Sequence, residues 1–149
     1  MEKEFKVLVA TELDVDNIVR LEQEYPFEQY SNNLILDSIK NSNYINLVAY
    51  EGNVVKGYLS ASIQFEDCDL LKIIVCSSRR RCGYGRMLMS KLIQCLNERH
   101  VDNIFLEVRK DNVVAIKFYR SIGFQKINER QKYYSDGMDA EIYRLGLNV

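Results

Sequence analysis

One short segment constrains the fold of this chain more than any other: a glycine-containing turn between an apolar strand and a long amphipathic helix. The run Ile73-Ile74-Val75 is typical of a buried strand. Gly83-Tyr84-Gly85 then precedes apolar residues at helical spacing from 88 to 96, and an alternating strand follows at 104–109. A strand–helix–strand unit of this kind requires a parallel, right-handed crossover. We therefore expect a mixed sheet with a parallel pair at its centre.

The remaining patterns place this unit within a hairpin-rich chain. Alternation predicts strands at 5–9, 45–50, 54–65, 69–76, 124–133 and 138–145, and helical spacing predicts helices at 11–24, 31–40 and 112–122. Gly52 and Gly137 mark hairpin turns, and Gly123 ends the last helix. Because no linker interrupts the chain, residues 1–149 are expected to form a single α/β (α+β) domain. Its sheet is expected to be mostly antiparallel, with about seven strands and about four helices.

Composition and charge exclude several classes of function. Basic and acidic residues nearly cancel, at 20 against 21, so a broad nucleic-acid surface is not expected. Arginines at 79, 80, 81 and 86 gather around the glycine turn without an acidic residue among them, which favours a small anionic ligand. The chain has no signal-like segment and no apolar run long enough to span a membrane, so we expect a cytoplasmic protein.

Metal and nucleophile chemistry find little support in the residues present. The four cysteines lack C-x-x-C or zinc-site spacing, and His100 is the one histidine. A single imidazole leaves few routes to a Ser-His-Asp or Cys-His nucleophile. We expect reduced, mostly buried thiols and no metal site.

The glycine turn suits an anion. Glycines before a helix let the backbone approach a ligand, and the free amides of the first helical turn attract negative charge. A P-loop requires Gly-Lys-Ser/Thr, and a dinucleotide fingerprint requires a third glycine at 88, where Leu88 stands. A pyrophosphate-sized site flanked by guanidinium groups remains, with a basic surface turn as the alternative.

The glycine turn and several later motifs of the chain resemble those of a known family. Arg80-x-x-Gly83-x-Gly85 resembles motif A of the GCN5-related N-acetyltransferases, the GNAT superfamily. Leu106-Glu107-Val108-Arg109-x-x-Asn112 and Arg130-x-x-Tyr133-Tyr134-x-x-Gly137 resemble its RimI-type branch, the ribosomal-protein-alanine N-acetyltransferases, and the latter run is shared with archaeal and eukaryotic N-terminal acetyltransferases. The resemblance covers residues 69–145 and rests upstream on Tyr25-Pro26-Phe27.

The resemblance implies acetyl-CoA as the acetyl donor, held largely by main-chain groups. The implied donor-binding residues are Ile73, Ile74, Val75, Arg80, Arg81, Cys82, Gly83, Tyr84, Gly85, Arg86 and Asn112. Core packing is the alternative for the side chains at 73–75, and helix capping is the alternative for Asn112. Lys72 stands where relatives usually have Asn, and Cys82 where many have Gln, Lys or Arg.

Two side chains are candidates for proton transfer. Forming an amide from an amine and a thioester requires loss of amine protons and is helped by a proton on the leaving thiolate. Glu107 is a charge within an apolar strand, which indicates a wet cleft or an ion pair, and the resemblance implies that it is the general base. Tyr119 is the implied general acid: a phenol of pKa ~10 is protonated at neutral pH and so carries a proton that the leaving thiolate can take. A core aromatic is the alternative for Tyr119.

The family implies a primary amine as acceptor, in this branch the α-amino group of a protein or peptide N-terminus, a ribosomal protein included. Tyr25, Phe27, Tyr133 and Tyr134 are expected to hold it, with a turn-stabilising pair as the alternative for the adjacent tyrosines. A polyamine or aminoglycoside acceptor, and a non-catalytic acyl-CoA sensor or assembly partner, remain alternatives. We expect no direct nucleic-acid partner, no membrane partner, and a monomer or weak dimer.

Overall fold

One seven-stranded sheet runs through the molecule in the order β1-β2-β3-β4-β5-β7-β6. The computed structural model describes residues 4–25, 29–80 and 83–147. The strands are β1 (Phe5–Val9), β2 (Tyr44–Glu51), β3 (Val54–Gln64), β4 (Asp67–Val75), β5 (Asn103–Arg109), β6 (Gln125–Arg130) and β7 (Ala140–Gly146). All neighbouring strands are antiparallel except β4 and β5, which are parallel. The expected mixed sheet with one central parallel unit is therefore confirmed.

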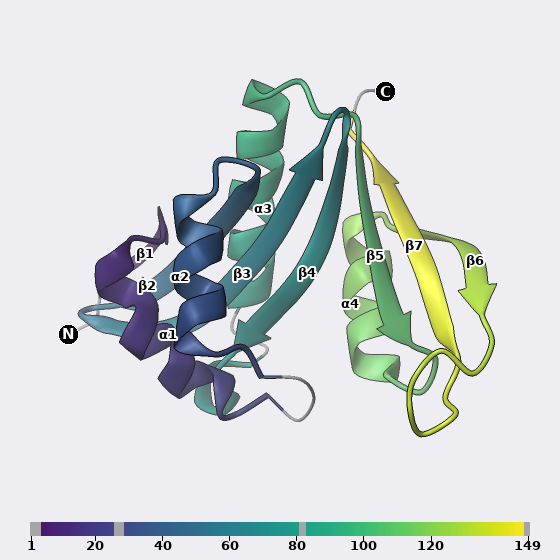
Figure 1. The fold of residues 1–149 in the computed structure, drawn as a ribbon, viewed down its shortest axis with the longest axis horizontal. Helices are drawn as coiled ribbons and strands as arrows, with labels where there is room; N and C mark the ends of the chain where they lie inside the picture. The colour runs from purple at the N-terminus through teal and green to yellow at the C-terminus, as the bar shows by residue number, and fades with distance from the viewer. Residues whose placement is uncertain (1–3, 26–28, 81–82, 148–149) are drawn as a thin grey trace.

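Helices cover both faces of this sheet. They are α1 (Val15–Glu22), α2 (Asn32–Lys40), α3 (Tyr84–Glu98) and α4 (Val113–Ile122), with short 3-10 turns η1 (Glu12–Asp14) and η2 (Ser77–Arg79). Figure 1 shows α1 and α2 on one face and α3 behind the sheet. Along β2, Leu47 and Ala49 enter the core shared with α3 and α4, whereas Val48 enters the core under α1 and α2. Successive side chains of a strand point to opposite faces, so a central strand covered on both sides is apolar throughout.

Local side-chain chemistry sets most helix ends. Thr11 and Asp14 form a reciprocal capping box at η1, and Ser31 accepts a hydrogen bond from the Leu34 amide at the start of α2. Gly123, with φ of +117°, ends α4 in the left-handed conformation. The first helical region is shorter than the predicted 11–24, because it begins as the 3-10 turn and α1 ends at Glu22.

Two strand predictions are wrong at their ends. Phe65 was expected in a strand, but β3 stops at Gln64 and Phe65 lies in the turn, with φ of +56° and its side chain 87% exposed. The last hairpin was expected to turn at 135–137, but the structure joins β6 to β7 by residues 131–139. There the Lys132 amide donates to Asp139 Oδ1 at 2.8 Å, a local hydrogen bond that replaces strand pairing.

Candidate active site

The parallel strands β4 and β5 diverge along their length. Their register pairs only Asp67–Asp69 with Asn103–Phe105, and Figure 1 shows the two arrows separating beyond this point. The opposite edge of β4 stays paired with β3 as far as Val75. A strand edge without a strand partner presents main-chain donors and acceptors to an extended ligand. The diverging part of β4, which includes the predicted donor-binding residues 73–75, has this property.

The side chains of the predicted strand residues pack in the core. Ile74 is buried with the α1–α2 side, while Ile73 and Val75 pack against the core on the α3–α4 side. This confirms the packing alternative for the side chains. It is compatible with ligand binding by the main chain, which stays a prediction.

The two glycines of the turn serve different purposes. Gly83 has φ of +87°, and a Cβ added there would meet no atom within 4 Å, so backbone conformation alone requires glycine. Gly85 lies in the first turn of α3, where a Cβ would be 3.0 Å from Cζ of Phe118 on α4. Gly85 therefore allows close packing of the two helices. Gly83 makes no side-chain cap, which leaves the first amides of α3 for an anion.

The arginines around the turn do not act as one group. Arg79 forms two hydrogen bonds with Glu51, at 2.6 and 2.8 Å, and the Tyr84 hydroxyl donates to the same carboxylate at 3.1 Å. Arg79 and Tyr84 thus link the turn to the end of β2, and Arg79, which the sequence placed in a basic cluster without an acid, is paired with Glu51.

Arg80 and Arg86 lie at the surface on either side of Gly83. Nε of Arg80 donates to the Val75 carbonyl at 3.3 Å, and a terminal nitrogen of Arg86 donates to Ser121 at 2.7 Å. Arg81 and Cys82 lie outside the described residues, so their predicted roles stay predictions.

Glu107 projects from β5 away from the buried side chains of its neighbours Leu106 and Val108. Its side chain is 33% exposed, and its carboxylate lies 3.6 Å from the guanidinium of Arg130. A hydrogen bond to Glu107 raises the pKa of the Tyr133 hydroxyl. The carboxylate therefore faces the β6–β7 connection, residues 131–139, which holds both predicted acceptor tyrosines.

Negative charge extends from Glu107 toward β4. Burial raises the pKa of the Asp69 carboxyl, and the charges of Asp67 and Glu107 raise it further. Asp67 and Glu107 thus create a negatively charged environment around Asp69, near the end at which β4 and β5 pair. Such an environment attracts a positively charged amine.

Tyr119 is buried in α4, with 9% of the residue exposed. Its ring contacts those of Phe118 and Phe124, at centroid distances of 5.5 and 5.7 Å. Burial raises the pKa of its hydroxyl, and the Tyr25 hydroxyl contributes in the same direction. Tyr119 is therefore a core aromatic, and its hydroxyl keeps its proton at neutral pH, as a proton donor must.

The β6–β7 connection carries Tyr133 and Tyr134 outside the strands. Their rings pack edge to face at 5.1 Å, Tyr133 is 47% exposed, and Tyr134 is half-buried with the Arg109 guanidinium 4.9 Å from its ring. Tyr25 helps to raise the pKa of Tyr134 as well as that of Tyr119. Tyr25, which follows α1, thus acts on Tyr119 of α4 and on Tyr134 of the β6–β7 connection. Phe27 lies outside the described residues.

Asn112 caps α4. Its side-chain oxygen accepts a hydrogen bond from the Ala115 amide at 3.2 Å, which confirms the capping alternative. A contact with the donor stays a prediction. The neighbouring Arg109 forms ion pairs with Asp111 and Asp136.

A buried ion pair lies beside this region and was not assigned a role from the sequence. Lys72 of β4 meets Glu22 of α1 at 2.8 Å, with both side chains almost fully buried. A usable signal was present, because Lys72 interrupts an apolar strand just as Glu107 does.

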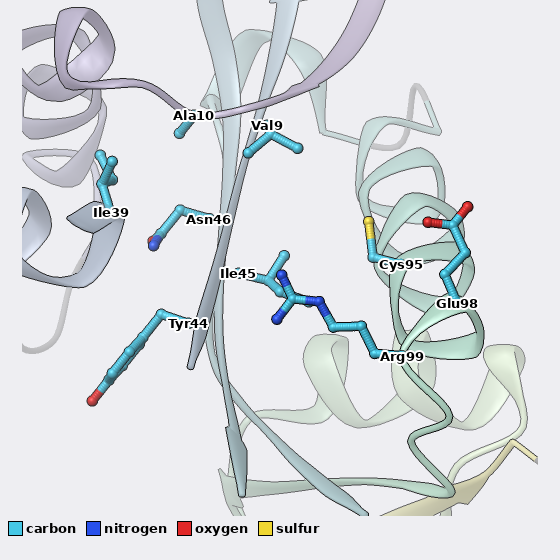
Figure 2. Close-up of a pocket in the computed structure, with 9 residues that line it drawn as sticks. All are labelled: Val9, Ala10, Ile39, Tyr44, Ile45, Asn46, Cys95, Glu98 and Arg99. Atoms are coloured by element: carbon cyan, nitrogen blue, oxygen red, sulfur yellow. The ribbon is translucent and has the colours of Figure 1, made fainter. Parts of the chain in front are cut away.

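A small cavity lies at the other end of α3 from the glycine turn. It has a volume of about 160 Å³ and is lined by Val9, Ala10, Ile39, Tyr44, Ile45, Asn46, Cys95, Glu98 and Arg99. Figure 2 shows these side chains around the start of β2, between α2 and the end of α3. None of the predicted site residues that the structure describes lines this cavity.

Within residues 4–25, 29–80 and 83–147, no cluster of His, Cys, Asp and Glu side chains is suited to a metal ion. The described cysteines are Cys68 and Cys76, both buried, and Cys95, which is half-buried; all three are free thiols. Burial raises the pKa of the Cys68 thiol to about 12. In the same part of the chain, no helix has the length and apolar character needed to cross a membrane.

The fold is that of the N-acetyltransferases. The crystal structure of the ribosomal-protein-S18-alanine N-acetyltransferase from Escherichia coli superposes with a TM-score of 0.89 at 26% identity, covering 98% of this chain and 96% of that one. The profile of the acetyltransferase (GNAT) family matches residues 13–124. This chain belongs to the GNAT family and is an enzyme that transfers acetyl groups to amines.

Two curated relatives are similar to this chain over most of its length. The [ribosomal protein bS18]-alanine N-acetyltransferase of Escherichia coli K12 is 31% identical over 115 residues, which cover 75% of this chain and 78% of the relative. The N-alpha-acetyltransferase of Sulfurisphaera tokodaii is 27% identical over 151 aligned positions, covering 93% of this chain and 90% of the relative. Members of the GNAT family use acetyl-CoA as the acetyl donor.

Proposed function

We propose that this enzyme transfers the acetyl group of acetyl-CoA directly to the N-terminal α-amino group of a protein, as its ribosomal-protein-alanine relatives do. The observation that carries the proposal is the position of Glu107. It is an exposed carboxylate on β5, where β4 diverges, and it contacts the connection that bears Tyr133 and Tyr134. We also propose that residues 1–149 form one N-acetyltransferase domain.

The residues present fit a donor held by its pyrophosphate and its extended arm. The uncapped first turn of α3 after Gly83 offers main-chain amides, and Arg80 and Arg86 add positive charge beside them. The main chain of residues 73–75 is assigned to the pantetheine arm, because the edge of β4 facing β5 lacks a strand partner there. Asn112 stands at the start of α4 and completes the described donor-binding set.

We assign proton transfer to the carboxylate of Glu107 and the phenol of Tyr119. Glu107 takes a proton from the acceptor's ammonium group, so that the neutral nitrogen can attack the thioester carbon. The N–C bond forms, the C–S bond breaks, and Tyr119 donates its proton to the leaving sulfur. The second amine proton then returns to Tyr119, so no covalent acyl-enzyme is needed.

The acceptor is assigned to the space between the α1–α2 and β6–β7 connections, at Tyr25, Tyr133 and Tyr134. Tyr25 influences the hydroxyls of both Tyr119 and Tyr134, which supports this placement. The shared negative charge of Asp67, Asp69 and Glu107 suits an incoming ammonium group.

The test offers the enzyme acetyl-CoA with peptides beginning Ala, Ser or Met, and follows thiol release and the intact mass of each peptide. We expect one acetyl group on a free N-terminus and none on a matched peptide with a blocked N-terminus and an internal lysine. Glu107→Gln and Tyr119→Phe are each expected to lower kcat by about 10²- to 10⁴-fold, the usual contribution of general acid–base catalysis. Glu98→Gln, at the far end of α3, is the matched control and is expected to keep wild-type kcat.

The alternatives have distinct outcomes in the same assay. Turnover of a polyamine or aminoglycoside, with none on any free N-terminus, would replace the protein acceptor by a small amine. Stabilisation by CoA against heat without product on any amine would indicate an acyl-CoA-binding sensor.

A further inference from the structure

A buried ion pair joins the end of α1 to β4. Nζ of Lys72 lies 2.8 Å from Oε2 of Glu22, and the two side chains are 3% and 1% exposed. Glu22 is the last residue of α1, and Lys72 directly precedes the strand residues 73–75 assigned to the donor. The pair therefore links the element that leads into the acceptor side with the strand on the donor side.

The same two charged groups hold the tyrosines of the connection. The Lys72 ammonium lies 3.5 Å from the ring centroid of Tyr30 and 4.5 Å from that of Tyr25. Oε2 of Glu22 also accepts a hydrogen bond from the main-chain N–H of Tyr30 at 3.1 Å. A desolvated ammonium over an aromatic face attracts it strongly. Lys72 thus contacts one tyrosine on each side of residues 26–28.

Stability alone does not account for this arrangement. Oε1 of Glu22 is buried and has no hydrogen-bond partner among the described residues, so the carboxylate is incompletely compensated. Removing two charges from water is expensive, and apolar side chains of similar volume often stabilise a core as well or better. What a buried pair supplies is a defined geometry for the groups that contact it.

We propose that Lys72, anchored by Glu22, is a positioning residue that holds Tyr25 and Tyr30 in the geometry that binds the acceptor. The inference rests on the proposed function, since it assigns the α1–α2 connection to the acceptor. The electrostatic influence of Tyr25 on Tyr119 and Tyr134 supports that placement. The expected effect of losing Lys72 is therefore on the acceptor and not on the donor.

The test compares Lys72→Met with wild type in steady-state assays that vary peptide and acetyl-CoA separately. We expect KM for the peptide to rise about tenfold, equivalent to about 1.4 kcal/mol, while KM for acetyl-CoA stays within about twofold. Lys40→Met is the matched control. Lys40 is the last residue of α2, at the end away from Tyr30, and its ion pair with Glu12 is exposed. This control is expected to change neither KM.

Lys72→Met leaves Glu22 buried without its partner, and that variant can lose stability for this reason alone. The double variant Glu22→Gln/Lys72→Met removes both charges and keeps an oxygen to accept the Tyr30 N–H. We expect it to unfold at a temperature close to wild type and to show the same selective rise in peptide KM. A peptide KM within twofold of wild type in the folded double variant would overturn the proposal.

A second readout does not depend on the acceptor. Chymotrypsin cleaves after aromatic residues, and mass spectrometry identifies the sites. We expect cleavage after Tyr30 to be faster in the double variant than in wild type and Lys40→Met; Tyr25 precedes Pro26 and is therefore not a chymotrypsin site. Unchanged cleavage would overturn the positioning role. If wild type acetylates no peptide, the proposed function fails, and the cleavage rate after Tyr30 still decides whether Lys72 holds that side of the connection.

Discussion

Replacing Gly83 with alanine tests the assignment of the glycine turn to the donor. Gly83 has φ of +87°, and the added methyl group would meet no atom within 4 Å, so the folded state pays only for backbone conformation. A non-glycine residue in the left-handed region costs about 1–2 kcal/mol. In a chain of this size that cost lowers Tm by about 2–8 °C.

Gly137→Ala is the matched control for this variant. Gly137 has φ of +86° with equally open surroundings, but it lies in the β6–β7 connection, away from the start of α3. Both variants should therefore lose similar stability. Only Gly83→Ala should reorient an amide assigned to the pyrophosphate. A hydrogen bond to a charged group contributes about 1.5–3 kcal/mol, so losing one lowers CoA affinity about 10- to 150-fold.

The assay combines thermal unfolding with titration calorimetry of CoA for wild type and both variants. The expected result is an equal fall in Tm for the two variants and a loss of CoA affinity in Gly83→Ala alone. Equal CoA affinity in the two variants would refute the assignment of the turn's amides to the donor. An unchanged Tm in both would refute the argument from backbone conformation.

Two further predictions concern charged contacts. Glu51→Gln weakens the paired hydrogen bonds with Arg79 that tie the turn to β2, so we expect KM for acetyl-CoA to rise several-fold while the acceptor KM is unchanged. Steady-state kinetics with each substrate varied checks this, and an unchanged KM for acetyl-CoA would contradict the role of the tie. The hydrogen bond from Lys126 holds the pKa of the Glu141 carboxyl below its ordinary value of 4.5. The folded protein binds that proton less readily than the unfolded chain does. This contribution to stability is therefore present above pH 4.5 and is lost as the pH falls below it. Urea unfolding at successive pH values should show that the free energy of unfolding falls less steeply toward acid pH in Lys126→Met than in wild type. Equal slopes would rule out the Lys126–Glu141 interaction as a source of this pH dependence.

Local patterns predicted the secondary structure well where short-range chemistry decides it. The helix caps at Thr11, Ser31 and Asn112 form within three residues of their partners, so the sequence contains all the groups involved. The end of β3 and the turn between β6 and β7 were misplaced. Phe65 adopts φ of +56° in the turn between β3 and β4, and the Lys132 amide donates to Asp139 within the β6–β7 connection; alternation signals neither.

For the candidate site, too, the sequence indicated individual residues, whereas their contacts became visible only in the structure. Glu107 and Lys72 stand out in the sequence as charges in apolar strands, but only the structure shows that Glu107 is exposed beside Arg130 and that Lys72 is buried against Glu22. Arg79 belonged to a basic run in the sequence, and its partner Glu51 lies 28 positions away. Such pairings depend on contacts between distant segments, for which a linear pattern holds no signal.

By itself, the sequence determined that a glycine turn joins a buried strand to a long helix in a parallel crossover, that the sheet is mixed, and that a carboxylate and a phenol are candidates for proton transfer. Each of these follows from periodicity, backbone preference or residue chemistry within one segment. Only the tertiary structure decided where β4 and β5 separate, that Arg79 pairs with Glu51, and that Lys72 contacts the rings of Tyr25 and Tyr30. These features arise from packing between segments far apart in the chain, because strand pairing and ion pairing are settled by which neighbours the whole fold brings together.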